Sequence, residues 1–318
     1  MSREHPSSSE ARPPLRPSRI LFEDWYAECM AQDPTDKMRR KAEAGKAMLN
    51  DLTPYILYND TDSLSDGNII AINKPPFITT HENGRIPPYG LTEVLQLATQ
   101  NSVLFNCHRL DTDTTGVILF AKNKTAITDM YKRTAARTPR SITKTYLALM
   151  QGVLKPKLTG AVLPLAGTDG LRRFVAEPDM PLPEHSLERS KYNSGKPKIS
   201  GTSFRPLTTY EDSNGKPWTL AAVRLHTGRT HQIRVVSSYL GHPIYGDPLY
   251  HPQAASTDRQ LLHAYELKLN PIPDDQILTQ PLTIQAPLPQ DFKDVLKSMR
   301  VQEAYNPQLA SLLDLDAH

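Results

Sequence analysis

The sequence predicts an α+β fold, with a mostly antiparallel mixed β-sheet core flanked by helices and loops. Short apolar segments typical of strands outnumber the segments typical of helices. The two kinds of segment do not alternate strictly, as they would in a doubly wound parallel sheet. The chain has 318 residues, of which 38% are hydrophobic, so it is long enough to bury a substantial core.

The N-terminal part of the chain is expected to lie outside this core. Residues 1–20 are rich in Ser, Pro and Arg, a composition typical of disordered chain. Residues 21–54 are predicted to form a helical extension, because Asp36 can cap a run of strong helix formers from Lys37 to Leu49. The mixed charges of this run indicate an extension that lies on the main domain.

The main domain is predicted to span residues 55–296, and its first half contains four strands and two helices. The first strand, 68–73, is a short apolar run that stops at Lys74-Pro75-Pro76. The later elements are recognised by apolar runs, by alternation or by helical periodicity. They are helix 91–98, strand 103–105, strand 117–122, the basic helix 125–137 and strand 144–150.

The second half of the main domain begins with a long loop-rich insertion at about 155–200, where Pro, Gly, Lys and Ser are frequent. Strands are predicted at 202–204, 219–225 and 261–269. A helix at 232–240 is expected to begin after Thr230 as its N-cap and to end at Gly241. Residues 297–318 are predicted to be a C-terminal tail.

Composition excludes several classes of protein. No apolar run approaches the roughly 18 residues that a membrane helix requires, so no membrane partner is expected. Cys29 and Cys107 are the only cysteines and cannot build a disulfide framework, which favours a reducing compartment. We therefore expect a cytoplasmic protein. A mitochondrial protein is the alternative, against which Glu4 and Glu10 count because transit peptides avoid acidic residues.

Positive charge is concentrated in the middle of the chain, although the formal net charge is only +3. The segment from Lys122 to Lys144 has seven basic residues and one acidic residue, and the segment from Ser186 to Arg205 has five and one. Such segments indicate a surface that binds a polyanion. A solvated helix face would produce the same pattern, so both interpretations stay open at this point.

The first candidate site is the polar loop from His108 to Gly116, which lies between two apolar strands. A rigid scaffold on both sides of a loop is typical of a functional site. Asp111 and Asp113 taken alone are typical of turns. His108 and Arg109 favour a functional loop, because a basic pair beside a carboxylate is not needed for a turn.

Two further residues are candidates for the same site. Arg234 falls near the start of a helix, where the helix dipole disfavours a cation, so we expect a carboxylate or phosphate partner unless it simply lies on the surface. Tyr146 is either a packing residue of its strand or, close to a polyanion, a platform for a base. Cys107 and the ten histidines fit no metal-ligand spacing, and Cys107 is interpreted as a core cysteine.

Several of these stretches, in order along residues 55–295, resemble the RluA-type pseudouridine synthases. His108-Arg109-Leu110-Asp111 followed by Thr114-Thr115-Gly116 resembles the signature loop of that family. Lys144-Thr145-Tyr146-Leu147-Ala148 resembles its second motif, and residues 227–247 resemble its third. Asn73-Lys74-Pro75 and Leu262-His263-Ala264 fall in the expected order. Thr115 stands where the family usually has serine, and Phe77 stands where it often has glycine.

The resemblance implies an isomerase that acts on RNA. The bond between C1′ and N1 of a uridine breaks, uracil rotates, and C5 bonds to C1′. Asp111 matches the catalytic aspartate, either as the nucleophile on C1′ or as a base at C2′. Arg234 matches the arginine that pairs with this aspartate, Tyr146 matches the tyrosine that stacks on uracil, and Arg109 matches the residue that fills the space left by the flipped nucleotide.

The resemblance also predicts the partners of the protein. The substrate is expected to be structured RNA, either rRNA or tRNA, bound by a monomer that requires no cofactor and no metal. The residues expected to bind RNA are His108, Arg109, Lys144, Arg229, His231 and Gln232.

Two other functions remain as alternatives. A glycoside or nucleoside hydrolase breaks a similar bond with two carboxylates, and Asp111 and Asp113 would share one face on extended backbone. A hydrolase would release free uracil, whereas an isomerase leaves the RNA mass unchanged. An RNA-binding protein without activity is the third interpretation, against which Asp111, Tyr146 and Arg234 count.

Overall fold

The computed structural model describes residues 19–31, 37–64, 66–81, 89–101, 103–135, 141–154, 161–167, 173–175, 197–251 and 257–304. The predicted disordered tail, 1–20, lies almost entirely outside these ranges, as do most of the insertion at 155–200 and the expected cap Asp36.

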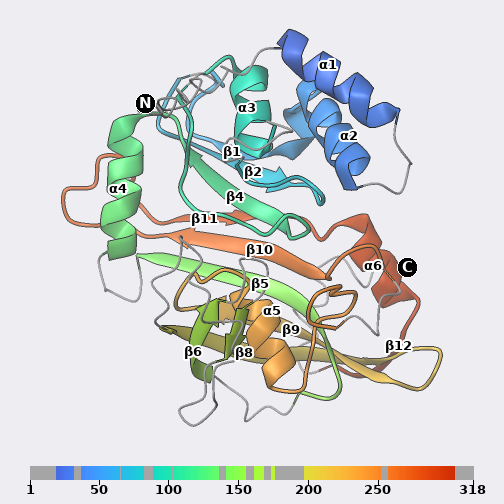
Figure 1. The fold of residues 1–318 in the computed structure, drawn as a ribbon. Coiled ribbons are helices and arrows are strands. Elements are labelled where there is room, and N and C mark those ends of the chain that lie inside the picture. The colour runs from blue at the N-terminus through green and yellow to red at the C-terminus, as the bar shows by residue number, and fades with distance from the viewer. Residues whose placement is uncertain are drawn as a thin grey trace, which may run out of the picture.

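A single mixed sheet of twelve strands forms the centre of the described chain (Figure 1). Its main path runs β1-β2-β4-β10-β5-β9-β8-β6-β7, with β3, β11 and β12 pairing at its sides. All described strand pairs are antiparallel except β4 with β10, which confirms the predicted α+β class. The strands are β1 (Ile56–Asn59), β2 (Ile69–Lys74), β3 (Phe105–Asn106), β4 (Thr115–Ala121), β5 (Ile142–Gln151), β6 (Ala161–Gly167), β7 (Arg173–Val175), β8 (Lys198–Glu211), β9 (Pro217–Leu225), β10 (Leu262–Leu269), β11 (Leu282–Gln285) and β12 (Arg300–Ala304).

Helices cover both faces of the sheet, because alternate residues of the central strands are apolar on both sides. On one face, Tyr146 and its β5 neighbours form a core with residues of α3 and α5. On the other face, α4 packs against β4, and α6 packs against the opposite side of β5. The helices are α1 (Arg19–Met30), α2 (Lys37–Asn50), α3 (Leu91–Thr99), α4 (Lys124–Ala135), α5 (Gln232–Tyr239) and α6 (Gln290–Lys297), with a short 3₁₀ turn at Thr53–Tyr55.

The N-terminal extension consists of two helices that pack beside α3 (Figure 1). Phe22 and Trp25 of α1 meet Tyr89 in an aromatic cluster, with ring centroids 5.2 to 5.4 Å apart. Gly45 of α2 allows close packing, since a Cβ there would lie 3.3 Å from the side chains of Phe22 and Val94. The predicted helical extension is therefore present and shares the core of the main domain.

Several elements differ from the sequence prediction. Strands β6 and β7 lie inside the segment predicted to be a loop-rich insertion, and β1, β11 and α6 were not predicted. The strand predicted at 202–204 is much longer, because β8 runs from Lys198 to Glu211 and pairs with three strands. Arg300–Ala304, predicted as part of a tail, form β12 and add to the edge of β8. The strand predicted at 103–105 is displaced to Phe105–Asn106, since Val103 is exposed.

The start of α5 also differs from the prediction. His231, and not Thr230, is the N-cap residue of this helix. It adopts a left-handed conformation with φ of 55°, which is uncommon for a residue other than glycine. The helix thus begins directly after a tight turn formed by the residues that follow β9.

Candidate active site

The Asp111 loop is held in a defined turn between β3 and β4. The Thr114 amide donates to the Asp111 carbonyl at 3.1 Å. The Thr80 hydroxyl donates to the Leu110 carbonyl at 3.0 Å and accepts from the Leu110 amide. Because residues 111–114 form a turn and not extended backbone, the expectation that Asp111 and Asp113 share one face of a strand is wrong.

Lys74, at the end of β2, supports this loop through a hydrogen bond to its backbone. Its buried ammonium donates to the carbonyls of Pro75, Ile78 and Thr112 at 2.7 to 2.9 Å. Burial lowers its pKa to about 7, a shift that the carboxylate of Asp113 partly opposes. The lysine therefore connects the end of β2 directly to the turn that carries Asp111.

Arg234 connects two carboxylates. Its Nε and Nη2 donate to the two oxygens of Asp247 at 2.7 and 2.8 Å, and its Nη1 donates to Asp111 Oδ2 at 3.2 Å. The Asp247 side chain is fully buried, the Arg234 side chain is 7% exposed, and the Asp111 side chain is 23% exposed. Burial opposes the charged forms of Arg234 and Asp247. The pKa of Arg234 is still raised and the pKa of Asp247 is still lowered, because the hydrogen bonds and opposite charges of the pair favour ionisation.

The backbone after α5 completes this arrangement. The amides of Leu249 and Tyr250 donate to Asp247 Oδ1 at 2.9 and 3.1 Å. The Tyr250 ring lies 5.3 Å from the centre of the Arg234 guanidinium. Asp247 is thus fixed by the chain that follows it, and it fixes the plane of Arg234 in turn. Arg234 has the carboxylate partner that a cation at a helix start was expected to have.

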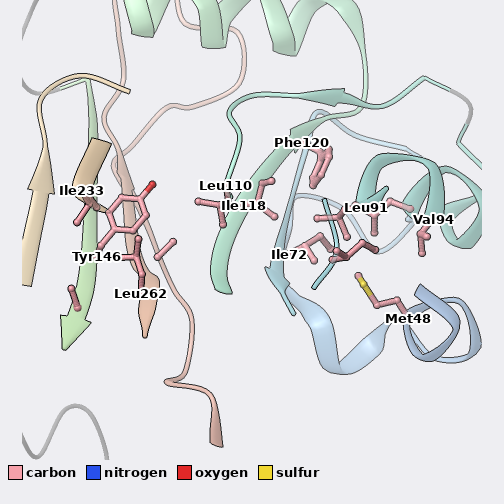
Figure 2. Close-up of a cluster of buried hydrophobic side chains, with 14 of the residues drawn as sticks. Met48, Ile72, Leu91, Val94, Leu110, Ile118, Phe120, Tyr146, Ile233 and Leu262 are labelled. Atoms are coloured by element: carbon pink, nitrogen blue, oxygen red, sulfur yellow. The ribbon is translucent and has the colours of Figure 1, made fainter. Parts of the chain in front are cut away.

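Tyr146 lies on β5 close to the aspartate. It is buried between Ile233 of α5 and Leu262 of β10 (Figure 2). Burial raises the pKa of the Tyr146 hydroxyl, and the negative charge of Asp111 raises it further. The hydroxyl therefore stays protonated near neutral pH, beside the carboxylate with which it interacts.

Thr115 and Gly116 fix the start of β4 against β10. The Thr115 hydroxyl lies 2.9 Å from His263 Nδ1, and His263 Nε2 lies 3.2 Å from the Ala286 carbonyl. Since only an N–H can bond that carbonyl, Nδ1 accepts from Thr115. Gly116 has φ of 105°, and a Cβ there would lie 2.2 Å from the Ala264 carbonyl oxygen, so glycine is required. Threonine in place of the usual serine keeps the hydroxyl that this contact needs.

An open groove with a volume of about 1340 Å³ surrounds these residues. Asp111, Tyr146 and Arg234 all line it. Its lining is strongly basic, because seven lysines and arginines face only two carboxylates, those of Asp111 and Asp113. The basic residues are Lys37, Arg109, Arg133, Lys144, Arg224, Arg229 and Arg234.

Three of the residues expected to bind RNA line the groove from the loop before β4 and from β5. Arg109 is exposed there. Lys144 is half-buried, and burial lowers its pKa to about 8. His108 uses Nε2 to accept from the Leu119 amide at 3.2 Å, and burial keeps its pKa well below the ordinary value. The imidazole of His108 is therefore neutral, and one of its nitrogens is occupied by the fold.

The other three expected RNA contacts come from the turn before α5. Arg229 is exposed, and His231 is half-buried with Nδ1 3.1 Å from the Tyr250 hydroxyl. The Gln232 side chain is buried and bonds only to the protein: it accepts from Thr227 and from the Arg229 amide, and donates to β8. An RNA contact by Gln232 does not fit this geometry, because its amide already holds the turn together.

Part of the basic segment 122–144 is also internal. Lys122 is buried and lies 3.5 Å from Asp60, and the buried Arg133 binds Asp275 and the Asn270 carbonyl. These two charges stabilise the fold and do not form a free cationic face. Cys107 has a free thiol whose pKa is raised to about 12 by burial, which agrees with the interpretation of a packing residue.

Sequence reasoning missed Lys74, Asp247 and His263 as supports of the site. All three lie in stretches that resembled the family, so their positions were available. Their roles were not, because the roles of Lys74 and His263 depend on contacts with distant parts of the chain, and that of Asp247 on the way the chain folds back onto Arg234 after α5.

The described residues contain neither a metal-binding cluster nor a membrane-spanning helix. Among the described residues, no three His, Cys, Asp or Glu side chains gather where they could hold a metal ion. No helix in the described ranges is long and apolar enough to cross a membrane.

The class of protein follows from comparison of the whole chain with known families. The model of the RNA pseudouridylate synthase family matches residues 68–239, a range that contains Asp111, Tyr146 and Arg234. The match covers more than half of the chain. The protein therefore belongs to this family of RNA-modifying isomerases, and within it to the RluA type.

Individual relatives agree with this assignment. The chain is 31% identical over 248 residues to the RNA pseudouridine synthase YhcT of Bacillus subtilis, across 76% of this chain and 73% of the relative. It is 33% identical over 251 residues to the ribosomal large subunit pseudouridine synthase D of Nitrosomonas europaea, across 74% of this chain and 64% of the relative. The fold resembles human RNA pseudouridylate synthase domain containing 4, with a TM-score of 0.59 and 23% identity, over 82% of this chain and 98% of that structure.

Proposed function

We propose that this pseudouridine synthase converts one specific uridine of a structured RNA, and that ribosomal RNA is the first candidate, with transfer RNA the second. The observation that carries the proposal is the buried Arg234, which joins Asp247 to the partly exposed Asp111 at the base of a basic groove. The name of the Nitrosomonas europaea relative, a large-subunit synthase, favours ribosomal RNA.

Asp111 is the catalytic carboxylate in this proposal. The Arg234 guanidinium donates a hydrogen bond to Asp111 Oδ2 and limits the rotation of the carboxylate, so one oxygen is available to attack C1′ or to take the proton at C2′. In the isomerisation the C1′–N1 bond breaks and a C1′–C5 bond forms. C5 gives up its proton and N1 gains one, so the mass of the RNA is unchanged.

Tyr146 and Arg109 handle the flipped base. The Tyr146 ring provides a platform for uracil, and burial in the wall formed with Ile233 and Leu262 supports this role. Arg109 is exposed beside the aspartate and fills the space that the nucleotide leaves. Removing a base from its stack costs a few kcal/mol, which stacking and phosphate contacts by Lys144 and Arg229 offset.

The protein acts as a monomer in the cytoplasm in this proposal. Its two free cysteines support a reducing compartment. Light scattering of the purified protein tests the monomer, and a fluorescent fusion tests the compartment, with mitochondria as the contrary result.

The decisive experiment is pseudouridine mapping of total RNA from cells with and without the protein. We expect one uridine, or a small defined set, to lose the modification and to regain it when the wild-type gene is returned. Unchanged maps would indicate a binding protein without activity. Release of free uracil from the RNA would indicate a hydrolase and refute the isomerase assignment for this site.

Asp111→Asn tests the carboxylate itself. The amide keeps the size of the side chain and can still contact Arg234, but it can neither attack C1′ nor take a proton. We expect turnover to fall by about a thousandfold or more, while RNA binding stays within a few-fold of wild type. Full modification by this variant would remove Asp111 from the catalytic role.

A further inference from the structure

We propose that the N-terminal extension reaches the substrate groove through Lys37, at the start of α2, and that Lys37 contacts a phosphate of the bound RNA. This inference rests on the proposed RNA substrate. It concerns a part of the chain that lies before the residues matched by the family model, which begin at residue 68.

The first support is the way in which α2 is attached to the main domain. Arg40 donates to Asp258 across 3.1 Å, and its guanidinium lies 5.1 Å from the centre of the Phe77 ring. Phe77 itself has φ of 68°, a conformation that costs free energy for a residue with a side chain. Arg40 therefore contacts the turn directly after Lys74, the lysine that supports the Asp111 loop.

The far end of the extension is equally well attached. Lys46 of α2 pairs with Glu23 of α1, and the aromatic cluster of α1 is buried against Tyr89. The helix α2 is thus attached to the main domain near its first turn, through Arg40, and to α1 near its other end, through Lys46. A side chain on this turn has a defined position relative to Asp111.

The second support is the position of Lys37 in this turn. Lys37 lines the groove, and its Nζ lies 3.9 Å from Asp113 Oδ2. The Lys37 side chain is 72% exposed. An ion pair at this distance and exposure contributes little stability, so the ammonium can bind a phosphate at small cost.

Asp113 does not depend on Lys37 for compensation of its charge. The negative charge of Asp113 raises the pKa of the buried Lys74, which shows a favourable interaction between the two side chains, and Arg259 Nη1 donates to the backbone carbonyl of Asp113 at 3.2 Å. The weak pair with Asp113 orients Lys37 toward the groove without neutralising it. A cation that is oriented, exposed and next to the catalytic loop matches the chemistry of a phosphodiester backbone.

The test measures how salt affects binding of a fluorescently labelled RNA stem–loop with uridines in its loop. Each phosphate contact steepens the decrease of log K with log salt by about 0.7 to 0.9. We expect Lys37→Gln to reduce the slope by about one contact and to weaken binding about three- to tenfold at low salt. Lys37→Arg is expected to keep the wild-type slope, because it keeps the charge.

Arg39→Gln is the matched control. Arg39 lies on the same helix turn and carries the same charge, but it pairs with Glu43 and does not line the groove. We expect it to bind with the wild-type slope. All variants are compared as the full chain, and thermal unfolding verifies that each is folded.

The outcomes separate this inference from the proposed function. If Lys37→Gln and Arg39→Gln both keep the wild-type slope, Lys37 does not contact phosphate and the inference is overturned. If the two variants lose slope equally, the effect is a general loss of charge and the specific contact is likewise refuted. If the wild-type protein itself binds without salt dependence, the basic groove does not bind RNA, and both the proposed RNA substrate and the proposed Lys37 contact are refuted.

Discussion

Asp247→Asn is the substitution that tests the architecture of the site most directly. Asp247 is fully buried and accepts four hydrogen bonds, two from Arg234 and two from backbone amides. Asparagine keeps the oxygen that accepts three of them. It replaces the other oxygen by an NH₂ group that faces Arg234 Nε, so two donors meet at a distance of 2.7 Å.

The size of the effect follows from these contacts. Breaking a buried ion pair by removing one partner costs about 3–5 kcal/mol. We expect the lower end, about 3 kcal/mol, because the new amide would keep one bond to Arg234 and Asp111 remains as a second carboxylate. For a domain of this size the loss corresponds to a decrease in Tm of roughly 6–12 °C.

Turnover is expected to fall as well. Arg234 is no longer held in one plane, so its contact with Asp111 becomes variable. We expect a decrease of about a hundredfold, equivalent to about 2.7 kcal/mol in the activation free energy. Because Asp247 lies away from the groove lining, the affinity for RNA should change little.

Calorimetry and single-turnover modification of the mapped RNA are the two assays. Glu211→Gln is the control, since it breaks an exposed pair with Arg300 whose N–O distance is also 2.7 Å. An exposed pair contributes less than about 1 kcal/mol, so this control should unfold within roughly 3 °C of wild type. Equal Tm values for Asp247→Asn and the control would refute the reasoning that Asp247 holds Arg234.

Two further predictions concern the contact between β4 and β10. Burial lowers the pKa of His263 from 6.5 to about 4, so between these pH values the unfolded chain binds the proton and the folded chain does not. Stability is therefore lost as pH falls from about 6.5 towards 4. In urea unfolding, the wild type should lose about 2 kcal/mol more stability than His263→Gln between pH 7 and pH 5. Equal losses for the two proteins would contradict a neutral buried imidazole. Gly116→Ala places a Cβ 2.2 Å from the Ala264 carbonyl oxygen and should cost more than about 3 kcal/mol or prevent folding. Gly215→Ala, also at positive φ but with nothing within 4 Å, should cost only about 1 kcal/mol, and a similar cost for both would show that the close approach is not what requires glycine.

Much of the fold could be predicted because the central strands have clear local sequence patterns. The apolar runs at β2, β4, β5 and β10 have ends within two or three residues of the prediction, since each strand is bounded by polar or Pro-containing sequence. The order of the strands could not be predicted. Strand β10 lies between β4 and β5 although it comes more than 100 residues later, and no local pattern encodes that neighbour.

The site shows the same limit at the level of single residues. The resemblance predicted that Asp111 and Arg234 form a pair, and they do. The charge count of residues 122–144 was less informative, because it does not tell which side chains point inward. Arg133 is buried and paired with Asp275, whereas Lys37, from a segment with mixed charge, has a side chain that is 72% exposed at the groove. Only the tertiary contacts show that these two cations have different roles.

The parallel pairing of β4 with β10 has a consequence for the synthesis of the protein. The Thr115–His263 contact joins residues that are 148 positions apart, and the Asp111–Arg234 contact joins residues 123 apart. Until β10 leaves the ribosome, the edge of β5 from Ile142 to Ala148 and the start of β4 at Thr115 and Gly116 lack their β10 partner. Such edges attract other chains, and long-range pairing is slow to form. A nascent chain stopped before residue 262 therefore contains Asp111, Tyr146 and Arg234 but lacks the strand that lies between β4 and β5. Truncated products of this length should require a chaperone to remain in solution.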